Sequence, residues 1–268
     1  MLIKATEINR NDILNYCLDE RIINTFIIGD IENFGFSKDF QDVWVDIKDN
    51  EIQGVLLRYH TMLIIYSKTL NMDFSVVQPI IENYSIEIIS GKSSVIDKVY
   101  PNLKGKYSRK NNNLSQIKNI DGLKDLTEKI QVATKDDAME IALAYGEIEE
   151  FKDLYSRDIN NRYNQIHNRI SSGEGKHIFI KDEEGIVAHG NTTAENSYSG
   201  MIGGVFTRKN MRYRGYGSQI VSYLVRDLMD RNKEVALFYR DEEEGNFFRK
   251  LGFEDTESWT VLGRDISE

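Results

Sequence analysis

The stretch "RYRGYGSQIV", residues 212–221, places two glycines among cations at the start of a helical pattern. The apolar side chains that follow have the spacing of one helix face: Ile220, Val221, Leu224, Val225 and Leu228. The first-turn N–H groups of such a helix have no partner within it and, together with the helix dipole, attract an anion. Gly215 and Gly217 lack a Cβ atom, so an oxygen atom can approach the main chain closely. We therefore predict an anion-binding turn whose donors are the N–H groups of residues 213–218.

Four cations surround this turn although the chain as a whole is acidic: Arg208, Lys209, Arg212 and Arg214. The sequence has 34 Lys and Arg against 43 Asp and Glu, which gives a formal net charge of −9. This balance argues against nucleic acid, or an anionic membrane surface, as the main partner. The cluster is therefore predicted to serve an anionic ligand, with one or two of the four side chains in contact with it.

The composition is that of a globular protein from a reducing compartment. The 268 residues leave room for two domains, and 40% of them are hydrophobic. The single cysteine, Cys17, lies in an apolar helical pattern and is interpreted as buried, so no intramolecular disulfide forms and the cytoplasm is favoured. The first residues do not resemble a signal peptide, and no apolar run is long enough for a membrane span. The histidines have no paired spacing, so no metal site is expected.

The order of predicted elements in the first half of the chain returns in the second half. The first half reads as a strand, a helical stretch from about 11 to 33, three strands, and then alternating helices and strands. A similar order starts again at "IQVAT" (130–134), after the polar, asparagine-rich stretch 111–126. We therefore predict two α/β domains, 1–122 and 128–268, that repeat one unit. A single large mixed α/β domain is the alternative.

The glycine spacing does not fit two common nucleotide sites. The turn is not G-x-G-x-x-G, and no acidic residue follows at the distance that a dinucleotide site needs. It also lacks the lysine and hydroxyl of a phosphate-loop NTPase. Instead, Arg212, Gly215 and Gly217 form the pattern R-x-x-G-x-G.

This pattern resembles the acetyl-CoA pyrophosphate loop, Q/R-x-x-G-x-G/A, of the GNAT acyltransferases. "GGVFTRKNMRYRGYGSQIV" (203–221) resembles strand 4, the loop and helix 3 of that family, and "FFRKLGF" (247–253) resembles the end of its motif B. The resemblance covers about residues 130–268. It implies tandem GNAT folds of the α/β class with mixed sheets. The first copy is interpreted as degenerate, because its corresponding connection, "KTLNMDF" (68–74), has no glycine.

The resemblance also implies which groups bind acetyl-CoA, the co-substrate. Main-chain groups of Val205, Phe206 and Thr207 would run beside the pantetheine, and Asn246 and Phe248 would border the cofactor. The pyrophosphate would be held by the loop residues Arg212, Tyr213, Arg214, Gly215, Tyr216, Gly217 and Ser218. No metal is implied.

Proton transfer is the part of the chemistry for which the sequence departs from the family. GNAT enzymes usually let the bound amine attack the thioester directly, so no nucleophilic residue is needed, but an acid must protonate the thiolate. The usual motif-B tyrosine is Phe248 here, and the strand-4 glutamate is missing. The candidate substitutes are Tyr239, Glu195 and His189. Tyr239 also fits an aromatic strand filler, and His189 a buried, hydrogen-bonded polar group.

We therefore expect a cytoplasmic N-acetyltransferase, monomeric or homodimeric, that transfers the acetyl group of acetyl-CoA to a primary amine of a small molecule. Glu147, Glu149 and Glu150 lie where the family closes over its acceptor, and they would suit a cationic amine or else form a solvated helix face. Two alternatives stay open. One is an amino-acid N-acyltransferase that uses a longer acyl-CoA, and the other is a CoA-binding module without catalysis.

Overall fold

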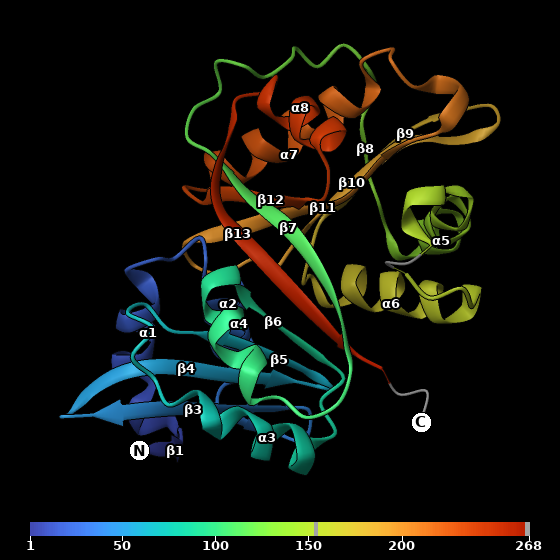
Figure 1. The fold of residues 1–268 in the computed structure, drawn as a ribbon. Helices are drawn as coiled ribbons and strands as arrows, with labels where there is room; N and C mark the ends of the chain where they lie inside the picture. Colours follow the sequence, from blue (N-terminus) through green and yellow to red (C-terminus); the bar gives the residue numbers. More distant parts are fainter. Residues whose placement is uncertain (153–154, 266–268) are drawn as a thin grey trace. The chain divides into compact units, whose positions relative to one another are not determined.

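The computed structural model of the chain describes residues 1–152 and 155–265, and these divide into two units (Figure 1). Unit 1 consists of Met1–Ser115, Phe238–Gly245 and the described part of Asp255–Glu268, and unit 2 consists of Gln116–Leu237 and Asn246–Glu254. The C-terminal segment, which the sequence assigns to the second domain, is thus grouped with the first half of the chain. The domain boundaries 1–122 and 128–268 stay a prediction.

Unit 1 is built on a mixed sheet with the strand order β1-β3-β4-β5-β6-β13, with β7 beside β13 and the short β2 beside β3. β5 and β6 are parallel, whereas the pairs β1–β3, β3–β4, β4–β5 and β6–β13 are antiparallel. The strands are β1 (Leu2–Lys4), β2 (Ser37–Lys38), β3 (Gln41–Lys48), β4 (Glu51–Tyr59), β5 (Met62–Tyr66), β6 (Ile88–Lys92), β7 (Tyr107–Ile117) and β13 (Phe253–Arg264).

The helical start of unit 1 contains two helices where the sequence predicts one stretch from 11 to 33. The side chain of Asn24 is buried between them, and its Nδ2 donates to the carbonyl oxygens of Cys17 at 2.9 Å and Glu20 at 3.2 Å. A side chain that binds the last carbonyls of a helix ends it, so the prediction of one helix is wrong at this turn. Cys17 itself is fully buried, as predicted. The helices of unit 1 are α1 (Arg10–Leu18), α2 (Thr25–Phe34), α3 (Val77–Tyr84) and α4 (Ser93–Val99).

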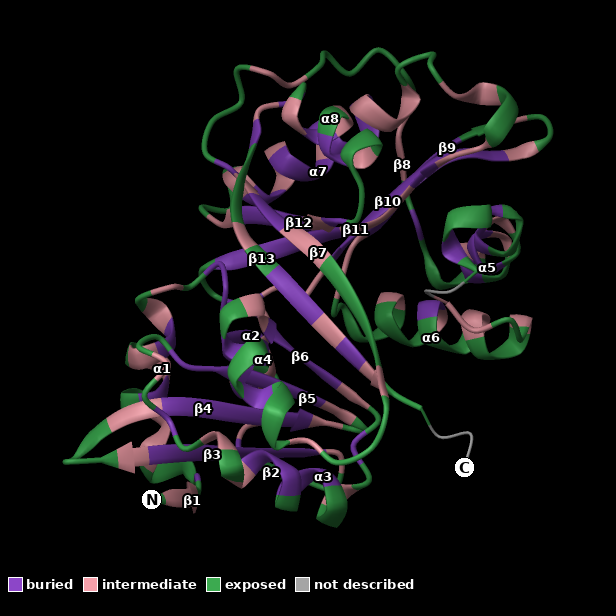
Figure 2. Ribbon diagram, viewed as in Figure 1, coloured by how far each residue is buried: buried purple, intermediate pink, exposed green. Residues whose placement is uncertain are grey.

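Aliphatic side chains from the sheet and from α3 and α4 form the core of unit 1. In Figure 2 the strands β3, β4 and β5 are buried along most of their length. Burying branched aliphatic side chains is the main favourable contribution to folding, at about 25 cal/mol per Å² of apolar surface. The core includes Leu56, Leu63, Ile65, Ile81, Ile89, Val95 and Ile96.

Unit 2 also has a mixed sheet, with the strand order β12-β11-β10-β9-β8. β11 and β12 are parallel, and the other pairs are antiparallel. The strands are β8 (Gln131–Val132), β9 (His177–Asp182), β10 (Gly185–Thr193), β11 (Ser199–Thr207) and β12 (Glu234–Tyr239), whose last two residues belong to unit 1.

Helix α7 packs on this sheet with the face that the sequence predicts. Ile220, Leu224 and Leu228 are fully buried, and α7 lies over β10 and β11. A Cβ atom on Gly190 of β10 would lie 2.6 Å from Ile220 Cγ2, so the glycine allows the helix to approach closely. The helices are α5 (Ala138–Glu147), α6 (Ile159–Ser172), α7 (Tyr216–Asp230) and α8 (Glu242–Arg249), which starts in unit 1. No helix in the described part of the chain is both long and apolar enough to cross a membrane.

The polar, asparagine-rich stretch 111–126, after which the sequence predicts that the second half begins, starts as a strand. Residues 111–117 are the second half of β7, and Leu114 is buried there. The segment that follows is held on α7, because the main-chain N–H groups of Thr127 and Glu128 donate to Gln219 Oε1 at 2.8 and 2.9 Å. Three consecutive asparagines, residues 111–113, are exposed or half-buried in this strand, and they are extended because β7 pairs with a neighbouring strand.

Candidate active site

Strand β11 leaves one edge open beyond its pairing with β12. The parallel ladder ends at Ile202↔Leu237, but β11 continues through residues 203–207, paired with β10 on its other edge. Among the described residues, no strand pairs with this segment on the β12 side. An extended ligand with amide groups can bind such an edge as an added strand. The open segment contains the residues predicted to run beside the pantetheine: Val205, Phe206 and Thr207.

A bulge at Gly204 shapes this open segment. The register between β10 and β11 shifts between His189 and Asn191 of β10, so β11 has one extra residue there. Gly204 has φ +57°, and a Cβ atom on it would lie 2.3 Å from both Asn191 Oδ1 and the Tyr145 hydroxyl oxygen. Only glycine fits both this conformation and this space.

Helix α7 begins directly after the loop that follows β11. Gly215 is its N-cap, with φ +87°, and the first helical hydrogen bond runs from Gln219 N to Gly215 O at 3.1 Å. The N–H groups of residues 216–218 precede that bond, so they are first-turn donors with no partner within the helix. Tyr213, with φ +62° and 95% of its surface exposed, projects from the loop. The structure thus supplies the predicted donors, and their binding of pyrophosphate stays a prediction.

Two of the four cations around this loop are engaged in ion pairs. The guanidinium of Arg212 binds both oxygens of Glu150, at 2.8 and 3.1 Å, and Arg208 pairs with Asp182. Two free cations therefore remain for a phosphate ligand. They are exposed and have no side-chain partner in the part of the chain that the structure describes: Lys209 and Arg214.

Helix α8 borders the loop through a ring that the sequence analysis missed. A Cβ atom on Gly217 would lie 3.5 Å from Phe247 Cζ and 3.1 Å from Thr207 Oγ1. Phe248, the predicted contact, is 8% exposed and packs against Phe247, while Asn246 is exposed. Phe247 precedes Phe248 in the motif, but only the packing of α8 shows which ring meets the glycine turn.

Two buried histidines connect the bulge to the neighbouring strands. His189 Nδ1 lies 2.8 Å from the Gly204 carbonyl oxygen and must carry the proton, because a carbonyl only accepts. Burial lowers the pKa of His189 to about 4 against the opposing effect of this hydrogen bond, so its ring is neutral and Nε2 accepts from His177 Nδ1 at 3.1 Å. His189 is thus a hydrogen-bonded polar group that holds the bulge, and its catalytic role stays a prediction.

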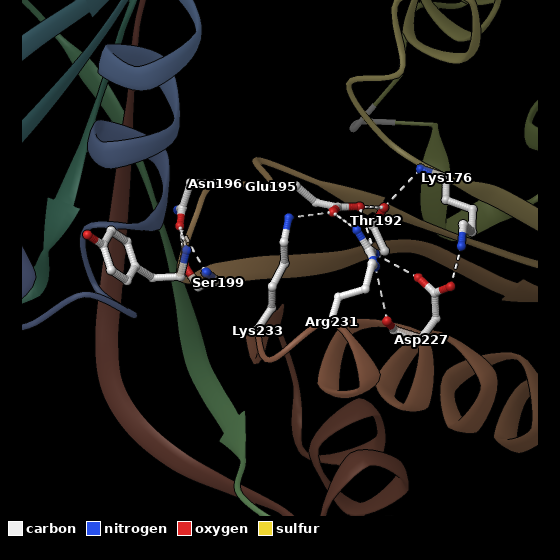
Figure 3. A network of polar contacts seen from close by, with 9 residues as sticks. Lys176, Thr192, Glu195, Asn196, Ser199, Asp227, Arg231 and Lys233 are labelled. Atoms are coloured by element: carbon white, nitrogen blue, oxygen red, sulfur yellow. Dashed lines mark hydrogen bonds and ion pairs between the residues drawn. The ribbon is translucent and has the colours of Figure 1, made fainter.

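Glu195 lies in the turn between β10 and β11, within a network of ion pairs (Figure 3). Its carboxylate accepts from Arg231 at 2.6 Å, from Lys233 at 2.9 Å and from the Thr192 hydroxyl. Burial raises the pKa of Glu195, but these donors together lower it to about 2. Arg231 also binds Asp227 at 2.6 Å, which ties the turn to the end of α7. These bonds favour a structural role for Glu195, and its catalytic role stays a prediction.

Tyr239 lies at the end of β12 and belongs to unit 1, where it is 3% exposed. Its hydroxyl donates to Asp255 Oδ2 at 2.8 Å, and Asp255 Oδ1 accepts from Ser115 at 2.6 Å. The Tyr239 proton is therefore engaged with a carboxylate in this structure. Its role as the acid of the reaction stays a prediction.

An open cavity of about 420 Å³ lies next to the bulge in unit 2. It is bounded by the end of α5, the turn that contains Glu149–Phe151, and the start of α6. Tyr145 lines it and also meets Gly204, so the cavity adjoins the open strand edge. Its walls combine aromatic with basic side chains: Tyr145, Phe151, Tyr155, Lys152, Arg157 and Arg162.

The glutamates that the sequence offers for a cationic acceptor do not line this cavity. Glu149 pairs with Lys152 at 2.6 Å, and Glu150 pairs with Arg212. Glu147 is exposed at the end of α5. Across the described residues, no cluster of His, Cys, Asp and Glu is arranged to hold a metal ion.

The first half of the chain has no counterpart of the open edge within its described residues. The ladder between β5 and β6 runs from Met62↔Ile88 to Ile65↔Gly91, and β5 ends at the next residue. The connection to α3 contains no glycine. The predicted degenerate character of the first copy therefore has a structural basis, because it lacks both the open strand and the glycine turn.

Residues 185–261 match a family model described as FR47-like protein, and no curated protein matches the chain. Solved structures resemble it over nearly its whole length. A Drosophila protein is 9% identical with a TM-score of 0.74, covering 100% of this chain and 99% of its own. A tandem GNAT protein from the clavulanic acid biosynthesis pathway is 9% identical with a TM-score of 0.59, and the coverage is 98% of this chain and 97% of that one. A GNAT-family acetyltransferase from Colwellia psychrerythraea is 12% identical with a TM-score of 0.58, and the coverage is 99% and 100%.

At these identities the likeness establishes the fold, and it agrees with the mixed sheets and the glycine turn of unit 2. The predicted α/β class and the predicted GNAT resemblance are confirmed. The chain therefore has a fold similar to that of a tandem GNAT protein, and its residues 185–261 match the family model described as FR47-like protein.

Proposed function

We propose that this chain is a cytoplasmic N-acetyltransferase that transfers the acetyl group of acetyl-CoA to a primary amine of a small molecule. One observation carries the proposal: the open edge of β11 at 203–207 leads directly into the turn whose free N–H groups start α7. The amides of a pantetheine arm can pair with the open edge, and a pyrophosphate can accept from the helix start.

Main-chain N–H groups and cationic side chains bind the phosphate groups of the co-substrate in this proposal. N–H groups of residues 212–218 bind the pyrophosphate, and Gly217 leaves room for its oxygens. Lys209 and Arg214, the cations without partners in the described part of the chain, are available for the 3′-phosphate. Arg212 becomes available only when it leaves Glu150.

The proposed reaction is direct transfer. The nitrogen of the neutral amine attacks the thioester carbonyl carbon, and a C–N bond forms as the C–S bond breaks. The amine loses one proton and the departing thiolate gains one. Phe248 has no proton to supply, so the thiolate takes its proton from water or from a hydroxyl such as that of Tyr239. His189 acts as a positioning residue, because it fixes the Gly204 carbonyl beside the open edge.

Two other functions remain to be distinguished from this one. An amino-acid N-acyltransferase would prefer a longer acyl-CoA over acetyl-CoA, and a CoA-binding module would bind the thioester without turning it over. Rates of thiol release with acetyl-CoA and with longer acyl-CoAs distinguish the N-acetyltransferase from the amino-acid N-acyltransferase. The absence of thiol release with any acceptor identifies the CoA-binding module.

Isothermal titration calorimetry of acetyl-CoA tests the binding site. We expect micromolar binding that is lost in Gly217→Trp, whose side chain occupies the space in front of the helix start, and weakened in Arg214→Glu, which reverses an exposed charge. Lys135→Glu is the matched control, because Lys135 is an exposed cation of unit 2 outside the loop. Equal affinity in the wild-type chain and in folded Arg214→Glu and Gly217→Trp would reject this site.

A further inference from the structure

The cavity beside Tyr145 contains basic groups that the proposed reaction does not use. Arg162 crosses from α6 to the end of α5, and its Nε and Nη1 donate to the carbonyl oxygens of Ala142, Ser156 and Arg157 at 2.7 to 3.0 Å. Its Nη2 donates to no group among the described residues. Three carbonyls orient this guanidinium, and no carboxylate among the described residues pairs with it.

The other basic groups of the cavity also lack acidic partners. Arg157 lies in the wall of the open cavity, and Arg169 lines a recess of about 10 Å³ that shares Tyr145, Tyr155 and Arg162 with it. Within the part of the chain that the structure describes, no carboxylate lines either space or pairs with Arg157, Arg162 or Arg169. In a chain with a net charge of −9, a set of three cations without acidic partners among residues 1–152 and 155–265 is a local exception.

The recess also holds a buried group that lacks a hydrogen-bond partner. His177 is 3% exposed, and its Nδ1 donates to His189 while its Nε2 has no partner among the described residues. Burial lowers the pKa of His177 to about 2, and the Coulomb interactions that its charged form would have with His189 and Arg169 add to the effect, so Nε2 carries a lone pair and no proton. The recess therefore presents one hydrogen-bond acceptor beside the cations.

Together these groups complement a ligand that has both a donor and an anionic group. A carboxylate can form two charge-assisted hydrogen bonds with a guanidinium, and an amine can donate to His177 Nε2 directly or through one water molecule. A purely cationic amine would instead be repelled by the basic side chains of the cavity wall. The aromatic rings of Tyr145, Phe151 and Tyr155 provide apolar surface between these groups.

We propose that this cavity selects an acceptor that carries a carboxylate in addition to its amine, in the simplest case an amino acid. The proposal rests on the proposed acetyl transfer and specifies the substrate class of that site. It assigns Arg162, which lines both spaces, to the carboxylate, and Arg169 to a contact with the carboxylate through one water molecule in the recess. It assigns Arg157 to the entrance, and the Tyr145 side of the cavity to the path toward the open edge of β11.

Thiol release from acetyl-CoA with paired acceptors tests the proposal. Glycine, serine, phenylalanine, glutamate and lysine are each compared with their α-amides, and kcat/KM is expressed for the neutral amine, because an α-amide lowers the amine pKa. We expect the free acids to exceed the amides by roughly tenfold or more for at least one side chain, as for the loss of a charge-assisted contact. Equal kcat/KM values for acids and amides, or higher values for amides, would overturn the proposal and leave the proposed acetyl transfer intact.

Two variants assign the effect to the cavity. Arg169→Gln and Arg157→Gln remove charges whose side chains make no bond within the described chain, so the fold should persist. Arg169→Gln should raise KM for the preferred acid by roughly tenfold without changing kcat/KM for its amide. Lys135→Gln, an exposed cation outside the cavity, should change neither value. If Arg169→Gln weakens acetyl-CoA binding instead, the cations serve the co-substrate and the proposal is wrong.

A binding measurement separates the carboxylate site from the transferase activity. If acetyl-CoA binds but no amine releases thiol, the same amino acids are titrated into the protein–CoA complex by calorimetry. Binding of an acid that is weakened in Arg169→Gln and absent for the amide would retain the carboxylate site in a protein without transferase activity. No binding of any acid would overturn it.

Discussion

The guanidinium of Arg212 and the carboxylate of Glu150 form a two-point ion pair, with Nη1–Oε1 at 2.8 Å and Nη2–Oε2 at 3.1 Å. Arg212 opens the R-x-x-G-x-G turn, and Glu150 directly precedes Phe151 and Lys152 in the wall of the cavity. The predicted co-substrate loop and the proposed acceptor cavity are therefore joined by one exposed salt bridge within unit 2.

Glu150→Gln should increase the affinity for acetyl-CoA, because it releases Arg212 for the phosphates. An exposed ion pair contributes about 0.2–1 kcal/mol, which corresponds to a decrease in Kd of up to about fivefold. Calorimetry at low and high salt measures the Kd for acetyl-CoA. The gain in affinity should shrink at high salt, because screening weakens the ion pair between Arg212 and Glu150. Glu149→Gln, which frees Lys152 instead, is the control. An unchanged or higher Kd in Glu150→Gln would show that Arg212 does not serve the co-substrate.

Glu195→Gln should destabilise the chain at neutral pH, because Arg231 and Lys233 lose their counter-ion. The pKa of Glu195 is lowered from 4.5 to about 2, so its stabilising contribution is complete above pH 4.5 and is lost as the pH falls toward 2. We expect a deficit of about 1–3 kcal/mol at pH 7 that shrinks across this window. Urea unfolding at pH 7 and pH 3 measures it. The exposed Glu183→Gln should show no deficit, and a catalytic Glu195 would lower kcat in a variant whose stability is normal.

His189 should make stability fall on mild acidification. Its pKa is lowered from 6.5 to about 4 in the folded chain, so between these values the unfolded chain binds a proton that the folded ring does not. At pH 5 this amounts to about 2 kcal/mol relative to neutral pH. His189→Gln keeps a donor for the Gly204 carbonyl but cannot titrate, so its stability should depend less steeply on pH. Urea unfolding at pH 7.5 and 5.0 measures the free energy of unfolding of both proteins. An equal loss of stability between the two pH values in His189→Gln and in the wild type would contradict a neutral, buried imidazole.

The sequence predicts those parts of the site that are formed by residues close together in the chain. The glycine turn and the apolar face of α7 are local patterns, and both are present in the structure. The bulge at Gly204 depends on the register with β10, and the recess beside the cavity brings together Tyr145 and His177 from separate elements. Such long-range pairings leave no periodic signal in the sequence.

The same limit explains two features of the fold that the sequence does not show. Apolar residues recur at helical spacing on both sides of the break in the stretch from 11 to 33, and the break depends on one side chain, Asn24, that binds the carbonyl of Cys17. The grouping of the last strand with unit 1 depends on the pairing of Trp259 with Lys92 and of the residues that follow, which lie far apart in the chain. Propensity and periodicity describe elements, and tertiary pairing decides their partners.

Gly204→Ala, compared with Gly203→Ala as its control, tests whether the bulge requires glycine. A Cβ atom at 204 would lie 2.3 Å from Asn191 Oδ1 and from the Tyr145 hydroxyl, at a left-handed φ of +57°. At Gly203 the nearest atom to a Cβ would be 3.9 Å away, so alanine fits there. Overpacking and a left-handed backbone together should cost about 2–4 kcal/mol in Gly204→Ala, against less than about 1 kcal/mol in Gly203→Ala.

The functional result of this pair separates the shape of the bulge from the general stability of β11. Moving Tyr145 and the Gly204 carbonyl disturbs both the cavity and the open edge, so folded Gly204→Ala should bind acetyl-CoA more weakly, while Gly203→Ala should bind it like the wild type. Thermal unfolding and calorimetry on the same samples measure both quantities. Equal effects of the two substitutions would mean that the β11 edge tolerates a changed bulge, and His189 would then have no positioning role to perform there.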